Sequence, residues 1–183
     1  EHWLKKRVLF LLFILEVALI FSLANHSFQV GQTIIVTNAA DHGEGTLREA
    51  LEAAGKGTVI EFSSEIFPEN EPTEIRLTRE LPGLEAGSIT IDASKAGVIL
   101  TKEDGYDGTC GLKIRSAHNT IKGLQIIGFP DFGILIEPDG SNNTIGGIGR
   151  TEGNTLGWMD GNGIGITGDG NLIINNKIGI DRK

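Results

Sequence analysis

Two short patterns recur along the second half of the chain and limit the folds it can adopt. The pattern Asn-x-Ile occurs at residues 119–121, 143–145 and 171–173. The pattern Gly-(Leu/Ile)-x-Ile occurs at residues 111–114, 123–126, 133–136 and 163–166. A self-similar unit of this length that carries several strands is typical of a solenoid, in which each unit forms one coil stacked on the next.

Composition agrees with a β-solenoid. Glycine accounts for 26 of the 183 residues and aromatic residues for only 6%, so aliphatic side chains must fill a core with many tight turns. Asparagines at one corner of successive coils can stack and hydrogen-bond as amide ladders do, with the isoleucines inside. A flat β-sandwich is the alternative, but it explains neither the asparagine offsets nor the helix described next.

A short helix is predicted after a strand at residues 33–37 and a turn-rich linker. Thr46 and Glu49 form a capping box, in which the Thr46 hydroxyl accepts from the Glu49 amide and the Glu49 carboxylate reaches back to the Thr46 amide. Leu47, Ala50, Leu51 and Ala54 then share one face. A helix this short needs something to cover, and we expect it to cap the open end of the solenoid. The alternative hypothesis, that Arg48 and Glu49 form a catalytic pair, explains the sequence less well than the cap does.

Further short strands separated by turns follow the helix. Residues 58–62, 74–77, 88–92 and 98–100 alternate or run apolar as strands do. The domain organisation predicted from these patterns has three parts: residues 1–24 as an export segment, 25–57 as the first strand, linker and capping helix, and 58–183 as solenoid coils.

The first 24 residues resemble an export signal. Lys5, Lys6 and Arg7 precede an apolar run from Val8 to Ala24, and residues 22–24 offer a small-x-small cleavage pattern. We expect a cleaved signal peptide and a secreted or cell-surface protein. An uncleaved N-terminal anchor is the alternative, and contact with a membrane is expected only through this segment.

Charge and cysteine content exclude some functions. The formal net charge is −8 and the sequence pI is about 5.0, so the surface repels phosphate backbones and a nucleic-acid partner is not expected. Cys110 is the only cysteine, so the chain has no internal disulfide. We interpret Cys110 as a small buried hydrophobic residue rather than a reactive thiol.

The stretch from Val36 to Ala50, Val-Thr-Asn-Ala-Ala-Asp-His-Gly-Glu-Gly-Thr-Leu-Arg-Glu-Ala, resembles the opening motif of secreted and surface right-handed parallel β-helix proteins of the pectate-lyase-like kind. In that family a "GTLREA" helix caps the solenoid. Residues 142–147, 153–156, 161–164 and 171–181 resemble the repeats of the same family. The resemblance implies an all-β, right-handed parallel β-helix with a short N-terminal capping α-helix. Because no polar cap follows the last repeat, we expect a fragment that lacks its C-terminal coils.

Enzymes of this fold bring carboxylates together across adjacent coils, and lyases among them bind Ca²⁺. The densest carboxylate cluster contains Glu103, Asp104 and Asp107, the candidates for a Ca²⁺ site. Asp104, Asp107 and Arg115 are the catalytic candidates. A solvated turn explains Glu103–Asp107 better, and no other cofactor is evident.

The expected function is therefore a non-catalytic extracellular or cell-surface scaffold that contacts polysaccharide, cell-surface glycan or other surfaces. The alternative is a carbohydrate-active enzyme, a polysaccharide lyase or glycoside hydrolase, with most of its catalytic coils beyond residue 183. A third hypothesis is that the chain is a passenger segment of an autotransported adhesin. The same fold supports all three, so fold does not decide among them.

Overall fold

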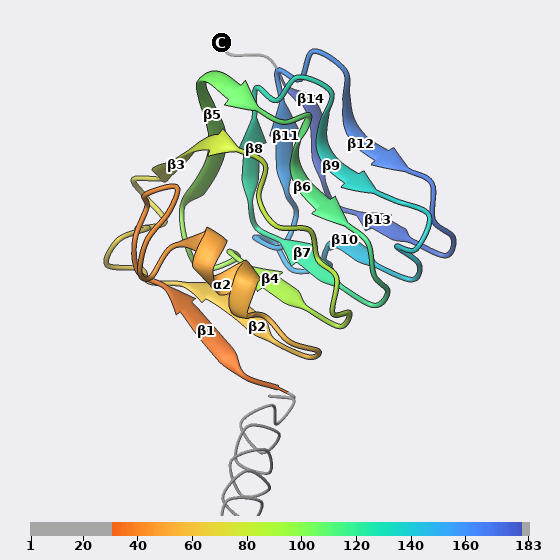
Figure 1. Cartoon of the computed structure of the whole chain (residues 1–183), viewed down its shortest axis with the longest axis horizontal. Helices are drawn as coiled ribbons and strands as arrows, with labels where there is room; N and C mark the ends of the chain where they lie inside the picture. Colours follow the sequence, from red (N-terminus) through yellow and green to blue (C-terminus); the bar gives the residue numbers. More distant parts are fainter. Residues whose placement is uncertain (1–30, 181–183) are drawn as a thin grey trace, which may run out of the picture.

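The structure, a computed structural model, describes residues 31–180. The predicted signal peptide or anchor at residues 1–24 lies outside this range. The described chain forms a parallel β-solenoid of about six turns with one short helix (Figure 1), which confirms the predicted fold class. Within residues 31–180, no helix is long and apolar enough to span a membrane.

Three parallel sheets form the walls of the solenoid. Sheet A has the strand order β1 (Thr33–Val36), β2 (Val59–Phe62), β4 (Thr90–Asp92), β7 (Thr120–Lys122), β10 (Thr144–Gly146), β13 (Leu172–Ile174). Sheet B has the order β3 (Thr73–Arg79), β5 (Val98–Asp107), β8 (Gln125–Ile127), β11 (Thr155–Gly157), β14 (Lys177–Ile180). Sheet C has the order β6 (Cys110–Ile114), β9 (Phe132–Ile136), β12 (Asn162–Ile166).

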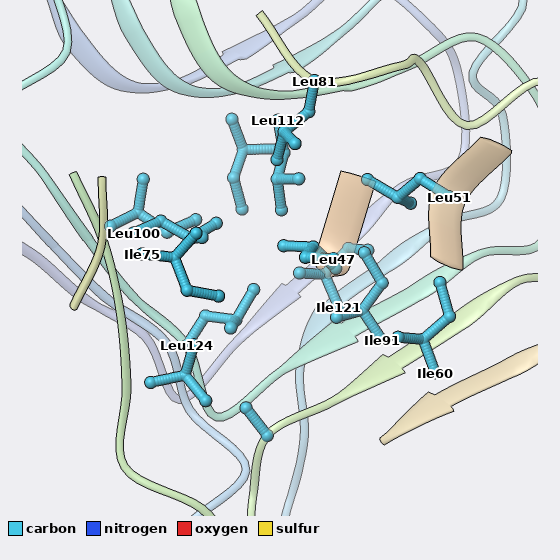
Figure 2. Close-up of a cluster of buried hydrophobic side chains, with 14 of the residues drawn as sticks. Leu47, Leu51, Ile60, Ile75, Leu81, Ile91, Leu100, Leu112, Ile121 and Leu124 are labelled. Carbon is cyan, nitrogen blue, oxygen red and sulfur yellow. The ribbon is translucent and has the colours of Figure 1, made fainter. Parts of the chain in front are cut away.

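The core consists of aliphatic columns that run along the solenoid. In sheet A the inward column is formed in register by Ile34, Ile60, Ile91, Ile121, Ile145 and Ile173. In sheet B it is formed by Ile75, Leu100, Ile126, Leu156 and Ile178. Figure 2 shows members of both columns facing one another across the interior. Because side chains alternate along a strand, the residues on either side of each column member face outward.

The four Gly-(Leu/Ile)-x-Ile segments are not equivalent, although the sequence pattern treats them alike. Residues 111–114, 133–136 and 163–166 lie in sheet C, whereas 123–126 enters sheet B. Gly123 forms a corner with φ of 76°. Gly111 instead lies within a strand, where an added Cβ would come within 2.7 Å of the Ile126 side chain. Local spacing does not distinguish a corner glycine from one required by close packing.

Helix α2 spans Leu47–Ala53 and buries the predicted face, with Leu47, Ala50 and Leu51 in the core. The Thr46 hydroxyl accepts from the Glu49 amide at 3.2 Å, as predicted. The return arm of the capping box differs, because the Glu49 carboxylate accepts from the amide of Gly45, at 2.7 Å, rather than from that of Thr46. The helix lies beside β1 and packs its apolar face into the first coils (Figure 1).

An asparagine ladder joins successive coils at the corner before sheet A. The Asn143 side-chain oxygen accepts from the Asn119 backbone amide at 2.7 Å and from its side-chain amide at 2.8 Å. The Asn171 oxygen accepts in the same way from both nitrogens of Asn143. Asn119 and Asn143 are each 1% exposed, so these bonds satisfy buried donors. The predicted stacking of these three asparagines is confirmed.

A second ladder, not predicted from the sequence, lies at the corner between sheets A and B. The Asn176 side-chain oxygen accepts from the backbone and side-chain nitrogens of Asn154, both at 2.9 Å. The Asn154 oxygen accepts from the Leu124 amide at 3.0 Å. The repeat is irregular in sequence, because Asn154-Thr-Leu156 has leucine where Asn176-Lys-Ile178 has isoleucine. Sheet A is therefore bordered on both sides by amide ladders.

The residue before the first ladder has a positive φ in coil after coil. This column contains Gly57 (81°), Ser88 (55°), His118 (63°), Asn142 (55°) and Gly170 (66°). Such a conformation disfavours residues other than glycine by about 1–2 kcal/mol.

We expect His118→Gly to stabilise the protein by about 0.5–1 kcal/mol, because the exposed imidazole gains little at this corner while glycine removes the backbone strain. Urea denaturation followed by circular dichroism measures the change. Ala117→Gly, one residue earlier and outside the positive-φ column, is the matched control and is expected to destabilise. Destabilisation by His118→Gly as large as that of the control would contradict the role assigned to this corner.

Candidate functional site

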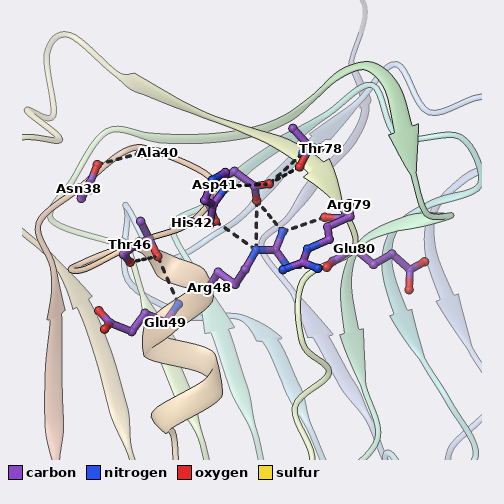
Figure 3. A network of polar contacts seen from close by, with 11 residues as sticks. Asn38, Ala40, Asp41, His42, Thr46, Arg48, Glu49, Thr78, Arg79 and Glu80 are labelled. Carbon is purple, nitrogen blue, oxygen red and sulfur yellow. Dashed lines mark hydrogen bonds and ion pairs between the residues drawn. The ribbon is translucent and has the colours of Figure 1, made fainter.

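Arg48 is the most heavily bonded charged side chain near the helix, and it is buried at 4% exposure. Its guanidinium bonds to the Asp41 carboxylate, with the closest N–O distance 2.5 Å, and donates to the Glu80 and Arg79 carbonyls at 2.6 and 2.9 Å (Figure 3). The other Asp41 oxygen accepts from the amide and hydroxyl of Thr78. Arg48 thus joins the linker, helix α2 and β3.

Electrostatics at this contact favour the ionised pair. Burial acts to raise the pKa of Asp41, but the hydrogen bonds from Thr78 and Arg48 outweigh it and hold that pKa below its ordinary value. The hydrogen bonds of the Arg48 guanidinium all go to protein acceptors: the Asp41 carboxylate and carbonyl, and the Glu80 and Arg79 carbonyls. The pair of Arg48 and Glu49 considered from the sequence does not assemble, because Glu49 is engaged at the helix start.

The predicted calcium and catalytic candidates lie at the end of β5 rather than in a turn. Glu103, Asp104 and Asp107 all belong to this strand, and Asp104 and Asp107 are exposed. Glycine at position 105, with φ of 80°, bends the strand between them. A strand places neighbouring side chains on opposite faces, so this arrangement does not by itself gather three carboxylates. In the described part of the chain, no group of three or more His, Cys, Asp or Glu residues is arranged to hold a metal ion.

Arg115, the third catalytic candidate, is engaged with other residues. Its Nε lies 2.6 Å from the Glu137 carboxylate and its Nη1 lies 3.3 Å from that of Glu85. Glu85 comes from the preceding coil and Glu137 from the following one, so the guanidinium bridges two coil interfaces. The structure does not bring Arg115 to Asp104 or Asp107.

Glu80 is the centre of a second set of contacts beside sheet C. Its carboxylate accepts from the Lys113 ammonium at 2.7 Å and from the amide and hydroxyl of Thr109 at 2.7 and 2.8 Å. Burial acts to raise the pKa of Glu80, but Lys113 and Thr109 lower it to about 2. Cys110 beside it is 1% exposed, and burial raises the pKa of its thiol to about 11. The interpretation of Cys110 as a buried residue is confirmed.

The low pKa of Glu80 makes its contribution to stability dependent on pH. Because the folded value is about 2 and the ordinary value is 4.5, the contribution is complete above pH 4.5 and is lost as the pH falls toward 2. We expect Glu80→Gln to cost roughly 1–2 kcal/mol at pH 7, discounted for partial exposure, and almost nothing at pH 2. Urea midpoints measured between pH 7 and 2 test this, and a difference that does not shrink on acidification would contradict it.

A third set of charged residues lies on the outer face of sheet A. The Lys122 ammonium lies 3.0 Å from the Asp92 carboxylate and 2.9 Å from that of Glu152. Burial acts to raise the pKa of Asp92, but hydrogen bonds from Ser94 and Lys122 hold it below its ordinary value. Asp92 and Lys122 are register partners in β4 and β7. The sequence contains the signal for this pair, because both follow a Thr-Ile dipeptide at residues 90–91 and 120–121.

Next to Asp92 the outer surface is hollowed to a volume of about 280 Å³. The hollow is lined by Glu61, Phe62, Ser64, Asp92, Lys95 and Ala96. Glu61 and Asp92 are register partners in β2 and β4, and Ser64, Lys95 and Ala96 come from the loops that follow these strands. The lining therefore combines hydrogen-bond acceptors and donors of both charges with a small apolar part.

Comparison of the chain with protein-family models, with curated proteins and with solved structures finds no significant match.

Proposed function

We propose that this chain is a rigid, non-catalytic scaffold that acts outside the cell or on its surface and contacts polysaccharide. The proposal rests on one observation: the clustered cations of the solenoid form ion pairs with carboxylates of the protein. Each clustered cation bonds to a carboxylate. The Arg48 contact joins helix α2 to the linker, and those of Lys113, Arg115 and Lys122 cross from one coil to another. Such contacts hold coils in register rather than leaving reactive groups poised.

The lowered pKa values of the paired carboxylates support a structural role for them. A glycoside hydrolase keeps one carboxylic acid protonated by raising its pKa and places it opposite a second carboxylate. The pKa values of Asp41, Glu80, Asp92, Glu137 and Glu152 are instead held below their ordinary values by paired cations or hydrogen bonds. Carboxylates of this kind suit cross-coil ion pairs.

A solenoid with paired charges and a hydroxyl-bearing outer wall also fits glycan contact. Its formal charge of −8 disfavours polyanions, while neutral sugar hydroxyls can bond to its surface carboxylates, amides and hydroxyls. The export signal predicted for residues 1–24 would place the protein where polysaccharides occur.

An assay for turnover and binding tests this function. The full 183-residue chain is incubated with neutral and acidic polysaccharides, with Ca²⁺ or with chelator, and new reducing ends, unsaturated products and retained binding are measured. The scaffold proposal expects binding to at least one polysaccharide without turnover. Calcium-dependent unsaturated products would establish a lyase instead, and reducing ends without unsaturation a hydrolase; either result overturns the proposal.

A further inference from the structure

The outer face of sheet A carries two parallel columns of side chains that the core does not use. One column contains, in register, Thr33, Val59, Thr90, Thr120, Thr144 and Leu172. The other contains, in register, Ile35, Glu61, Asp92 and Lys122. Neighbouring strands in a sheet lie about 4.8 Å apart, so the three successive threonines Thr90, Thr120 and Thr144 present a regular row of hydroxyls.

These hydroxyls are available to a ligand. Within the part of the chain that the structure describes, those of Thr90, Thr120 and Thr144 make no hydrogen bond to another protein group, and the three side chains are half-buried. A threonine fixed in a strand loses little rotamer freedom on binding, since its χ1 is already restricted. The row therefore offers donors and acceptors at low entropic cost.

The hollow beside Asp92 adjoins this row. Thr90 and Asp92 are two residues apart on the same outward face of β4, a separation of about 7 Å along the strand. In the hollow, the Glu61 carboxylate and the Lys95 ammonium are exposed and, among the described residues, without an ion-pair partner. The Asp92 carboxylate is instead compensated by Lys122.

The charges of the hollow indicate the chemical class of the ligand. Glu61 and Lys95 offset each other, but Lys122 is shared by the Asp92 and Glu152 carboxylates, so one net negative charge remains around the hollow. An anionic sugar would place its carboxylate near Glu61 and Asp92 and would be repelled. A neutral sugar can donate hydroxyls to Glu61, accept from Lys95 and rest its carbon face against the apolar part of the lining.

We propose that this hollow and the adjoining threonine row form a binding site for a neutral glycan chain lying across the outer face of sheet A. The inference rests on the proposed function and deepens it by naming the face and the ligand class. One sugar unit occupies the hollow between Glu61 and Lys95. The following units pass over Thr90 and its neighbours in β7 and β10.

Titration calorimetry of the full 183-residue chain with cellohexaose, laminarihexaose and mannohexaose tests the site, with an oligogalacturonate as the acidic probe. We expect a neutral hexasaccharide to bind more tightly than the oligogalacturonate. Glu61→Gln and Lys95→Met should each weaken that binding five- to tenfold, the effect of losing about one hydrogen bond. Thr155→Val, which removes an outward threonine from sheet B, is the matched control and should change affinity less than twofold.

The outcomes separate this inference from the proposed function. Neutral glycan binding that Glu61→Gln and Lys95→Met leave unchanged would overturn the site and keep the scaffold function. Preferred binding of the oligogalacturonate, or binding that Thr155→Val weakens as much as Glu61→Gln does, would also overturn the site. Absence of binding to every glycan would overturn both the site and the glycan-contacting function.

Discussion

Arg48→Met is expected to destabilise the protein by about 3–5 kcal/mol, the cost of leaving one member of a buried ion pair without its partner. The substitution keeps an unbranched side chain of similar width but removes every bond to Asp41 and to the Glu80 and Arg79 carbonyls. The Asp41 carboxylate, 8% exposed, would retain its hydrogen bonds from Thr78 and a contact of 3.9 Å with the His42 imidazole. Urea denaturation at pH 7, followed by far-ultraviolet circular dichroism, measures the loss.

A double variant identifies the source of the effect. Asp41→Asn in the background of Arg48→Met removes the uncompensated charge, and we expect it to recover part of the lost stability. Arg76→Met is the matched control, because Arg76 pairs with Glu74 at the surface, with 54% of its side chain exposed, and should cost less than about 1 kcal/mol. A loss for Arg48→Met no larger than for the control would show that the buried contact contributes little.

Asn143→Ala is expected to have the next largest effect, a loss of about 2–4 kcal/mol. The Asn143 side-chain oxygen is the acceptor for both nitrogens of Asn119. Removing it leaves the buried Asn119 backbone amide unsatisfied, at a cost of about 1–3 kcal/mol before relaxation, and leaves the Asn119 side-chain amide with only its bonds to Ser116. The small cavity left by the missing amide adds to the loss. Thermal and urea denaturation measure it.

The control for the ladder is Asn162→Ala, at an exposed asparagine in β12 that belongs to neither ladder. Its effect should stay within about 0.5 kcal/mol. Asn143→Asp provides a second check, because it buries an unpaired carboxylate and turns the donor to the Asn171 oxygen into a second acceptor; at pH 7 the loss should be at least as large as for alanine. Equal effects of Asn143→Ala and Asn162→Ala would contradict the role of the ladder.

Periodic features of the solenoid were predictable from the sequence because they repeat. The offsets between Asn119, Asn143 and Asn171 located one corner of the coil, and the inward isoleucines followed from alternation. The second ladder was missed because Asn154 is followed by Thr-Leu rather than Thr-Ile, so that within this ladder only Asn176-Lys-Ile178 matches the pattern. An apolar residue precedes both ladders, because the Ile89 and Leu124 backbone amides donate to the oxygens of Asn119 and Asn154.

Contacts between distant segments were not predictable in the same way. Asp41 meets Thr78, 37 residues later, and nothing local to either residue indicates the partner. Likewise, Glu103, Asp104 and Asp107 are close in sequence but belong to β5 rather than to a turn. Their part of β5 is irregular, because the register with β3 shifts between Lys102 and Asp107. The pair of Asp92 and Lys122 is intermediate: their shared Thr-Ile context is visible once the coils are aligned.

The parallel ladders also determine how the molecule would respond to mechanical tension. Hydrogen bonds between coils, including those of Asn143 and Asn171, join one coil to the next, so a pull on the last coil loads one interface at a time. Opening one coil interface does not require the next interface to open. Shear along a strand, by contrast, loads many hydrogen bonds at the same time. Force spectroscopy should therefore record a series of low, evenly spaced steps as the chain peels away coil by coil.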